Sequence, residues 1–271
     1  MNFPLSLEQA LRILEPVCVA ILLARIASER LLFQYRAFTA YLLIWFCQDV
    51  APLVFGLNLG GNSYALFFFI TEPLAWLFSY LVLLELFDLT FTDFPGIRSA
   101  GRFLLISAIV LSGLIVAGTA APSLVRLHGV GWLYTLYLVV ERSVMILSLI
   151  LLGALQVLMW RYSLQLPRNT VYYSRIYAIH FATRAVQVFA FGEFDRNLVF
   201  LGNIGASLID IACLLYLAWV LTRNGALAQI PAGPKLSDSQ RTELRERLEG
   251  VNSLLSGLKR KKEAGKTKMP R

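Results

Sequence analysis

The sequence predicts an all-α integral membrane protein, a bundle of seven transmembrane helices followed by a short cytoplasmic amphipathic helix. The first observation is composition: of the 271 residues, 57% are hydrophobic and 15% are charged, whereas a soluble domain has about 45–50% apolar and about 25% charged residues. The second is segment length, because a helix needs roughly 20 apolar residues to cross the hydrocarbon core. The third is the placement of the arginines, which gather in alternate connections.

Seven apolar segments are long enough to cross a bilayer, and they fill residues 1–223, the predicted transmembrane domain. They are residues 7–27, 37–57, 64–87, 103–121, 131–161, 171–191 and 198–221. The fifth has Trp132 and Trp160 near its ends, where aromatic side chains mark the two membrane interfaces. The sixth is the least hydrophobic. If it does not cross, six spans remain and the C-terminus changes side.

The arginines predict the orientation, because cytoplasmic connections are enriched in positive charge. One side of the predicted bundle carries nine of them: Arg25, Arg30, Arg36, Arg98, Arg102, Arg161, Arg168, Arg175 and Arg223. The other side carries three: Arg12, Arg126 and Arg196. We therefore expect the N-terminus outside and the C-terminus in the cytoplasm. Before Lys235 the chain has arginines but no lysine, its connections are short, and it has no N-x-S/T sequon. These features agree with a multi-pass protein of a bacterial cytoplasmic membrane.

A basic cytoplasmic tail at residues 235–271 follows a Gly/Pro/Ala linker at 224–234. Within 236–262, five apolar residues are spaced 4, 3, 4 and 3: Leu244, Leu248, Val251, Leu255 and Leu258. This heptad seam predicts an amphipathic helix that forms a short coiled coil in a homodimer or with a cytoplasmic partner. The basic end at 259–271 suits anionic lipid. The alternative is a solvated tail whose lysines only enforce the topology.

Several ionisable residues lie at a similar depth inside the predicted spans, and helical spacing turns polar faces toward the interior of a membrane bundle. They are Asp49, Glu72, Glu141, Arg142, His180, Arg184 and Asp210. At about 1.5 Å of rise per residue, they fit within a layer roughly 10 Å thick. We expect this layer to be a pocket for a small molecule or a proton.

The predicted layer contains four carboxyl groups but only two guanidinium groups. Because burying unmatched carboxylates is costly, we expect at least one of the acids to be protonated at neutral pH. Glu141 and Arg142 are adjacent and therefore point about 100° apart on a helix. We expect Arg142 to pair with Glu72 or Asp210, and Glu141 to pair with Arg184.

Several familiar sites are absent from the sequence. The seventh span has no lysine for a retinal Schiff base, and the helix-end motifs of G protein-coupled receptors are missing. No H-E-x-x-H, G-x-S-x-G or P-loop motif occurs, and the chain has only two histidines. We therefore expect no catalytic residues, no cofactor, no metal ion and no nucleic-acid partner, which disfavours an enzyme.

Three classes of function fit these observations. The first is a receptor- or sensor-like module, in which the pocket binds a ligand and the tail reports to a partner. The second is a proton-coupled secondary transporter of a small solute, with the carboxyl groups as a proton relay. The third is a structural or assembly subunit whose polar layer only holds the helices together. The sensor is favoured because the tail is the only sizeable cytoplasmic element. Seven-helix receptors are similar to this chain in shape and not in motif.

Overall fold

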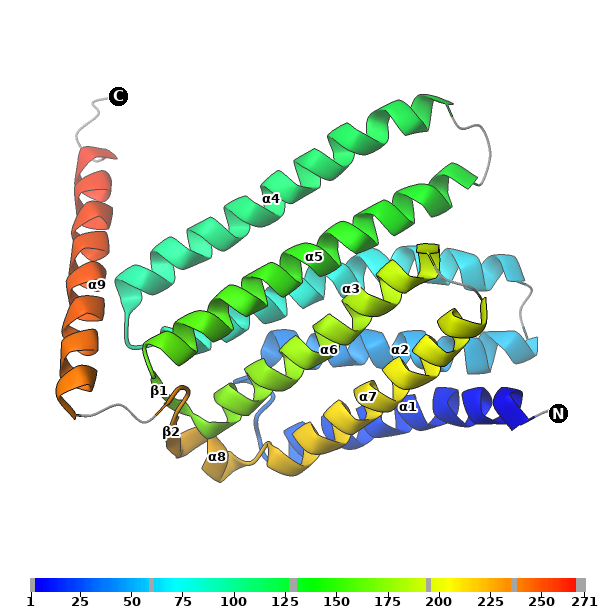
Figure 1. Cartoon of the computed structure of the whole chain (residues 1–271), viewed down its shortest axis with the longest axis horizontal. Helices are drawn as coiled ribbons and strands as arrows, with labels where there is room; N and C mark the ends of the chain where they lie inside the picture. The colour runs from blue at the N-terminus through cyan, green and yellow to red at the C-terminus, as the bar shows by residue number, and fades with distance from the viewer. Residues whose placement is uncertain (1–2, 59–60, 127–130, 194–195, 235–237, 267–271) are drawn as a thin grey trace.

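The computed structural model describes residues 3–58, 61–126, 131–193, 196–234 and 238–266, and it is 86% helical. The predicted all-α class is therefore confirmed. The long helices that build the bundle (Figure 1) are α1 (Phe3–Ser28), α2 (Arg36–Asn58), α3 (Gly61–Thr90), α4 (Pro95–Arg126), α5 (Gly131–Arg161), α6 (Arg168–Glu193) and α7 (Arg196–Val220). The bounds of α5 are those predicted for the fifth span.

Six of these helices close into a ring. Going around it, α1 packs against α2, α2 against α3, α3 against α5, α5 against α6, α6 against α7, and α7 returns to α1. The remaining helix, α4, lies outside the ring against α3 and α5 (Figure 1). The predicted span at 103–121, which carries no charge, is therefore the one that the ring leaves out.

Packed aromatic side chains close the half of the ring that is nearer the C-terminal ends of α1 and α7. Tyr173 of α6 lies against Tyr35 and Phe38, with ring centroids 5.6 and 4.5 Å apart. One turn further along α6, the hydroxyl of Tyr177 donates a hydrogen bond to the backbone carbonyl oxygen of Ser79 in α3 at 3.3 Å. Because Ser79 also lines the cavity described below, this aromatic packing lies next to the cavity.

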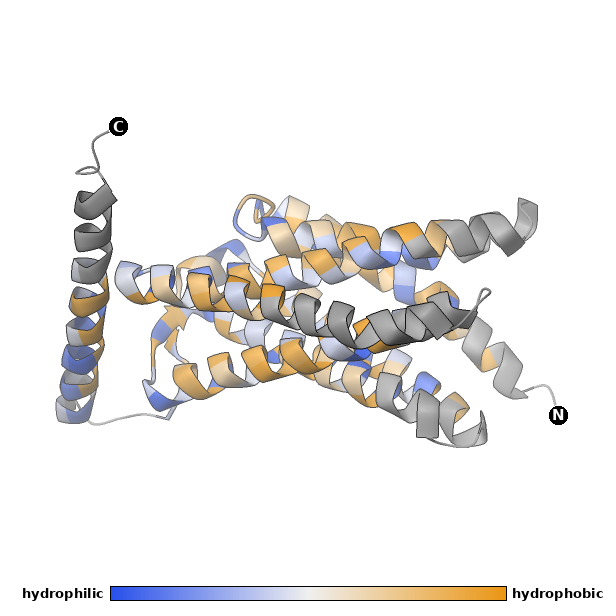
Figure 2. Cartoon of the chain, turned by 90° about the horizontal axis from the view of Figure 1, so that it is seen from above, coloured by the Kyte–Doolittle hydropathy of each residue, from blue (hydrophilic) through white to orange (hydrophobic). Residues whose placement is uncertain are grey.

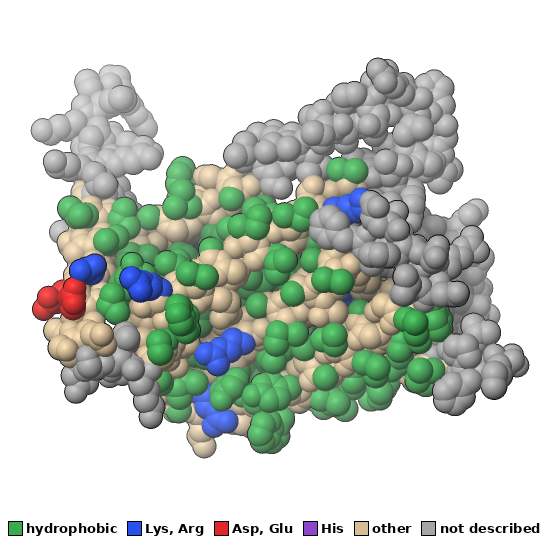
Figure 3. Space-filling model, viewed as in Figure 1, with side chains coloured by type: hydrophobic (Ala, Val, Ile, Leu, Met, Phe, Trp, Pro, Cys, Tyr) green, Lys and Arg blue, Asp and Glu red, His purple; other side chains and the backbone are tan. Residues whose placement is uncertain are grey.

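On the face of the bundle that Figure 3 shows, apolar side chains lie over much of the described surface. Trp219, Phe103 and Val186 are 73%, 68% and 70% exposed. Among the described residues, three segments are long and apolar enough to cross a membrane: Ile70–Thr90, Val139–Arg161 and Phe200–Val220. This indicates a membrane protein, but it corrects the predicted number of such helices, which was seven. In α6, His180 and Tyr177 lower the hydropathy although both are buried in the ring. Parts of α2 and α4 lie outside the residues whose side chains the structure describes.

A two-stranded sheet ties the end of α7 to the connection between α5 and α6. After α7 come the short helix α8 (Arg223–Leu227) and the strand β2 (Gln229–Pro231). This strand pairs antiparallel with β1 (Gln165–Pro167), with Leu166 opposite Ile230. Residues 224–234, which were expected to be a linker, thus contain two short elements, while the division of the chain into domains stays a prediction.

The residues after β2 are also held against the bundle. The backbone N–H of Ala232 donates to the carbonyl oxygen of Leu164 at 2.9 Å, and the guanidinium of Arg175 donates to the Ala232 carbonyl oxygen at 2.9 Å. Gly233 follows at a point where a Cβ atom would overlap the backbone of Trp160. A glycine is therefore required for the chain to pass this close to α5.

Acidic side chains cap two helices at this end of the bundle. Glu85 of α3 accepts a hydrogen bond from the backbone N–H of Ala37, in the first turn of α2, at 2.7 Å. Glu29, which follows α1, accepts from the backbone N–H of Arg223, the first residue of α8, at 2.7 Å. Both carboxylates satisfy backbone N–H groups that have no partner within their own helix, at the end where the helix dipole favours negative charge.

The tail helix α9 (Asp238–Lys266) lies across the end of the long helices in both Figure 1 and Figure 2, and packs against α4. Leu248 is only 7% exposed. The side-chain oxygen of Asn252 accepts a hydrogen bond from the backbone N–H of Gly96, in the first turn of α4, at 2.6 Å. Of the predicted seam, Val251 stays 49% exposed and Leu258 lies outside the described side chains. The seam therefore packs in part on the chain's own bundle.

Candidate functional site

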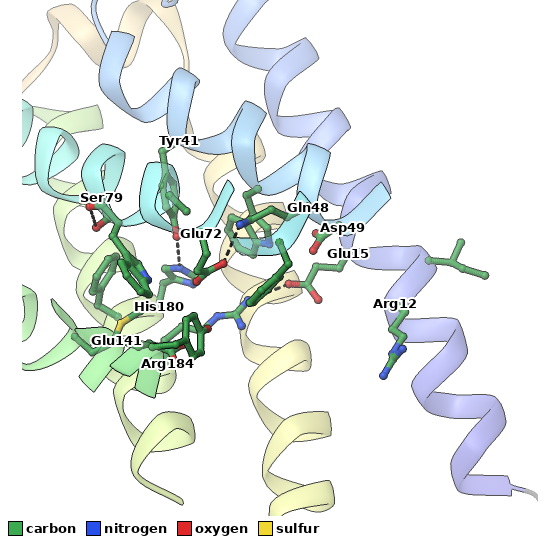
Figure 4. Close-up of a pocket in the computed structure, with 18 residues that line it drawn as sticks. Arg12, Glu15, Tyr41, Gln48, Asp49, Glu72, Ser79, Glu141, His180 and Arg184 are labelled. Carbon is green, nitrogen blue, oxygen red and sulfur yellow. Dashed lines mark hydrogen bonds and ion pairs between the residues drawn. The ribbon is translucent and has the colours of Figure 1, made fainter. Parts of the chain in front are cut away.

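The ring encloses a cavity of about 680 Å³, lined by side chains from α1, α2, α3, α5 and α6 (Figure 4). Its charged and titratable lining residues are Arg12, Glu15, Tyr41, Asp49, Glu72, Tyr137, Glu141, His180 and Arg184. The helices bring these groups together because each carries a polar face that would be costly to expose to lipid. Figure 4 shows Arg12 apart from the others, toward the N-terminal end of α1.

Arg184 of α6 is the centre of an ion-pair network on one side of the cavity. One of its terminal nitrogens lies 3.1 Å from a carboxylate oxygen of Asp210 in α7 and 3.3 Å from one of Glu15 in α1. The guanidinium carbon also lies 5.7 Å from the ring centre of Trp45, in a cation–π contact. Arg184 therefore joins α1, α2, α6 and α7, and both of its acidic partners come from helices outside the α3–α5 side of the cavity.

His180 extends this network toward α2. Its Nδ1 atom lies 2.7 Å from the Asp210 carboxylate, whose side chain is 1% exposed. A carboxylate at this distance makes Nδ1–H the donor, so in neutral His180 the Nε2 atom accepts from the hydroxyl of Tyr41 at 3.2 Å. Trp45 packs over the imidazole at 4.9 Å between ring centroids. The histidine is thus held in one orientation by a carboxylate, a hydroxyl and an aromatic face.

The α3–α5 side of the cavity has a different composition. Glu72 of α3 accepts a hydrogen bond from the side-chain amide of Gln48 at 2.8 Å. The carboxyl group of Glu141 is repelled by that of Glu72 and attracted by Arg184 and Arg142. Tyr137 lines the cavity together with these two acids. The ring of Tyr137 packs at 5.5 Å from that of Trp76. This side therefore combines two acids with two stacked aromatic rings.

Asp49 lies on the α2 wall of the cavity. Its Oδ2 atom is buried and has no hydrogen-bond partner among the described residues. A buried acceptor without a partner costs on the order of 1–3 kcal/mol. A donor that enters the cavity would recover part of this cost.

The structure brings together most of the residues that the sequence singled out. Five of them line the cavity: Asp49, Glu72, Glu141, His180 and Arg184. Asp210 lies behind the wall, in contact with His180 and Arg184. Arg142 is not among the lining residues. The expected pairing of Glu141 with Arg184 is wrong, because Arg184 pairs with Asp210 and Glu15.

Glu15 is the acid of the cavity lining that sequence reasoning missed. The first span was expected to begin at residue 7, which placed Glu15 in its first turns. The helix begins at Phe3, so Glu15 lies about halfway along it, and the residue is only 9% exposed. A signal was present: Glu15–Pro16 in α1 repeats the dipeptide Glu72–Pro73 in α3, and both prolines lie inside their helices.

The fold and the cavity define a helical membrane protein with a charged internal site. Within the part of the chain that the structure describes, no three His, Cys, Asp or Glu residues are grouped closely enough to hold a metal ion. No family model, no curated protein and no solved structure matches this chain. The geometry of the cavity is therefore the basis for the functional proposal.

Proposed function

We propose that this chain is a receptor- or sensor-like module of seven membrane spans whose central cavity binds a small ligand. The cavity is the observation that carries this proposal. Its volume of about 680 Å³ falls inside the range of roughly 300–1,000 Å³ that is usual for small-molecule sites. A polar layer that served only to hold helices together would instead be filled by mutually paired side chains.

The number of spans in this proposal is supported by helix length and by the direction of the polar groups. The shortest of the seven long helices, α2, has 23 residues, and roughly 20 suffice to cross. Glu15, His180 and Arg184 reduce the hydropathy of α1 and α6, yet their side chains line the cavity. Lipid would therefore contact mainly apolar side chains. The arginine bias then places the N-terminus outside, in agreement with a bacterial cytoplasmic membrane.

A sensor needs a connection between the ligand site and an output element, and α6 provides one. Its middle supplies His180 and Arg184 to the cavity. Its first turns supply Arg175, which holds the backbone at Ala232, shortly before the tail helix. A displacement of α6 on ligand binding would thus move the segment that leads into α9. The tail partner, whether a second copy, another protein or anionic lipid, would read this change.

The proposal is tested with a variant that fills the cavity. Ala75 lines the cavity, so Ala75→Trp should abolish any ligand-induced rise in thermal stability of the purified protein in nanodiscs. Val157, 63% exposed on α5, offers the matched control Val157→Trp. Two outcomes of a small-molecule screen would contradict ligand binding in this cavity. In the first, the compounds that stabilise the protein act equally on Ala75→Trp and Val157→Trp. In the second, no compound stabilises the wild type or Val157→Trp.

A proton-coupled transporter is the second candidate, and the chain of hydrogen bonds from Asp210 through His180 to Tyr41 favours it. Such a chain is a suitable path for a proton. Solute flux into proteoliposomes that follows a pH gradient, and that is lost in Asp210→Asn and Glu141→Gln, would select the transporter. If the same variants lower stability and change neither binding nor flux, the structural subunit is the better description.

A further inference from the structure

We propose that the cavity takes a small organic cation, in which an ammonium group lies between Glu72 and Glu141 and an aromatic or alkyl body lies against Trp76 and Tyr137. This inference rests on the proposed ligand-binding function and names the class of ligand. It follows from the charges, the aromatic rings and the size of the cavity.

The charges that line the cavity are unbalanced. Four carboxyl groups face two guanidinium groups, those of Arg12 and Arg184. Arg184 is shared between Glu15 and the buried Asp210, so it is already surrounded by acids. At the opposite wall, Glu141 is attracted by Arg184 and Arg142, but the repulsion that it experiences from Glu72 is larger than either attraction. A monocation between these two carboxyl groups would relieve that repulsion.

The aromatic rings stand next to the acids by helix geometry. Trp76 follows Glu72 by four residues on α3, and Tyr137 precedes Glu141 by four residues on α5. Residues four apart share a helix face. The two rings face each other across the helix pair, with centroids 5.5 Å apart and planes inclined by 31°. Carboxylates together with aromatic faces are the groups that recognise an organic ammonium ion.

The size of the cavity separates an organic cation from a bare ion. Within the described residues no acid or histidine cluster could hold a metal ion. A volume of about 680 Å³ has room for an apolar body as well as a charged group. The buried Oδ2 atom of Asp49, which has no hydrogen-bond partner among the described residues, offers an acceptor to a further N–H or O–H group of the same ligand.

The test is calorimetric titration of the full-length protein in lipid nanodiscs with three probes of similar shape. They are 2-phenylethylammonium, neutral 2-phenylethanol and anionic phenylacetate. We expect the ammonium probe to bind at least about tenfold more tightly than the alcohol, since hydrogen bonds to charged groups are roughly twice as strong as neutral ones. Benzyltrimethylammonium, whose charge does not depend on pH, should also bind more tightly than the alcohol.

Two variant pairs assign the binding to the named side chains. Glu141→Gln should weaken binding of the ammonium probe about tenfold to a hundredfold, whereas Asp93→Asn, an exposed acid outside the cavity, should not change it. Trp76→Leu should weaken binding roughly threefold to thirtyfold, whereas Trp219→Leu, on the exposed face of α7, should not. Glu72→Gln provides a second acid variant, and the thermal unfolding midpoint shows that each variant is folded.

The outcomes separate the ligand class from the proposed function. If the alcohol or phenylacetate binds as tightly as the ammonium probe, and Ala75→Trp abolishes this binding, the cavity is a ligand site but the cation proposal is wrong. If no ammonium probe binds the wild type at millimolar concentration, the cation proposal is also overturned, and the screen on Ala75→Trp decides the proposed function independently. Loss of cation binding in Glu141→Gln with retention in Asp93→Asn supports the proposal.

Discussion

Replacing Asp210 with asparagine removes a negative charge that is 1% exposed and keeps the shape of the side chain. The carboxylate contacts His180 at 2.7 Å and Arg184 at 3.1 Å. Removing one partner of a buried ion pair typically costs about 3–5 kcal/mol of unfolding free energy. The asparagine oxygen can still accept from His180, and Arg184 retains Glu15. We therefore expect a loss near the lower limit, about 3 kcal/mol.

The chain offers a matched control in Asp88→Asn. Asp88 also pairs with two arginines, Arg98 at 2.9 Å and Arg102 at 3.8 Å, but their side chains are 41% and 57% exposed. Exposed pairs contribute about 0–1 kcal/mol, so this variant should be close to wild type. The measurement is unfolding of the purified protein by increasing SDS in mixed micelles, followed by circular dichroism. Equal losses in the two variants would refute the reasoning that burial makes the Asp210 network important.

Two further predictions concern the end of the bundle where the tail docks. Gly233→Ala should lower the unfolding free energy by about 1–3 kcal/mol, because its Cβ would overlap the backbone of Trp160. In the same SDS titration Gly153→Ala, which meets no atom within 4 Å, should be neutral or stabilising by up to about 1 kcal/mol. Asn252→Ala removes the hydrogen bond to the first turn of α4 and should weaken the docking of α9 on the bundle by about 1 kcal/mol. The measurement is hydrogen exchange of residues 238–256, which should become severalfold faster. Ser253→Ala removes a hydroxyl that donates to the carbonyl oxygen of Gly250 in its own helix, and it should leave this exchange unchanged. Equal exchange in both variants would contradict a docked tail.

The sequence predicts the helical class and the position of most long helices, because apolar segments separated by polar connections are local features. It also identifies most of the acids and bases of the cavity, since a charged residue inside an apolar segment is visible without any knowledge of packing. The bounds of α5 and the inward position of Glu141 follow from this local information.

The pairing of the charges could not be predicted, because the sequence does not say which helices are neighbours. In the ring α7 packs against α1 as well as α6, and this arrangement places Glu15 beside Arg184. Helix α5, which carries Glu141, also packs against α6, so the neighbouring helices alone do not decide which acid pairs with Arg184. The same limit applies to β2, whose three residues pair with β1 across more than sixty intervening residues of chain.

The tail shows a third kind of difference. The heptad spacing indicates a helix with an apolar seam, and α9 is helical. Spacing alone does not identify the surface that covers the seam. Leu248 packs on the bundle whereas Val251 stays exposed, so the face that docks is turned relative to the predicted seam. Asn252, a polar residue on that face, provides the specific contact with α4.

The most direct test of the central cavity is its access from water. Ala75→Cys, in a background that lacks the exposed Cys47, should react with a membrane-impermeant cationic thiol reagent added on the side of the N-terminus, because Ala75 lines the cavity. Val157→Cys, on the outer face of α5, should not react. Prior addition of a ligand found in the screen should protect Ala75→Cys. An Ala75→Cys protein that is as unreactive as Val157→Cys would show that the cavity is closed to water, and would contradict the account.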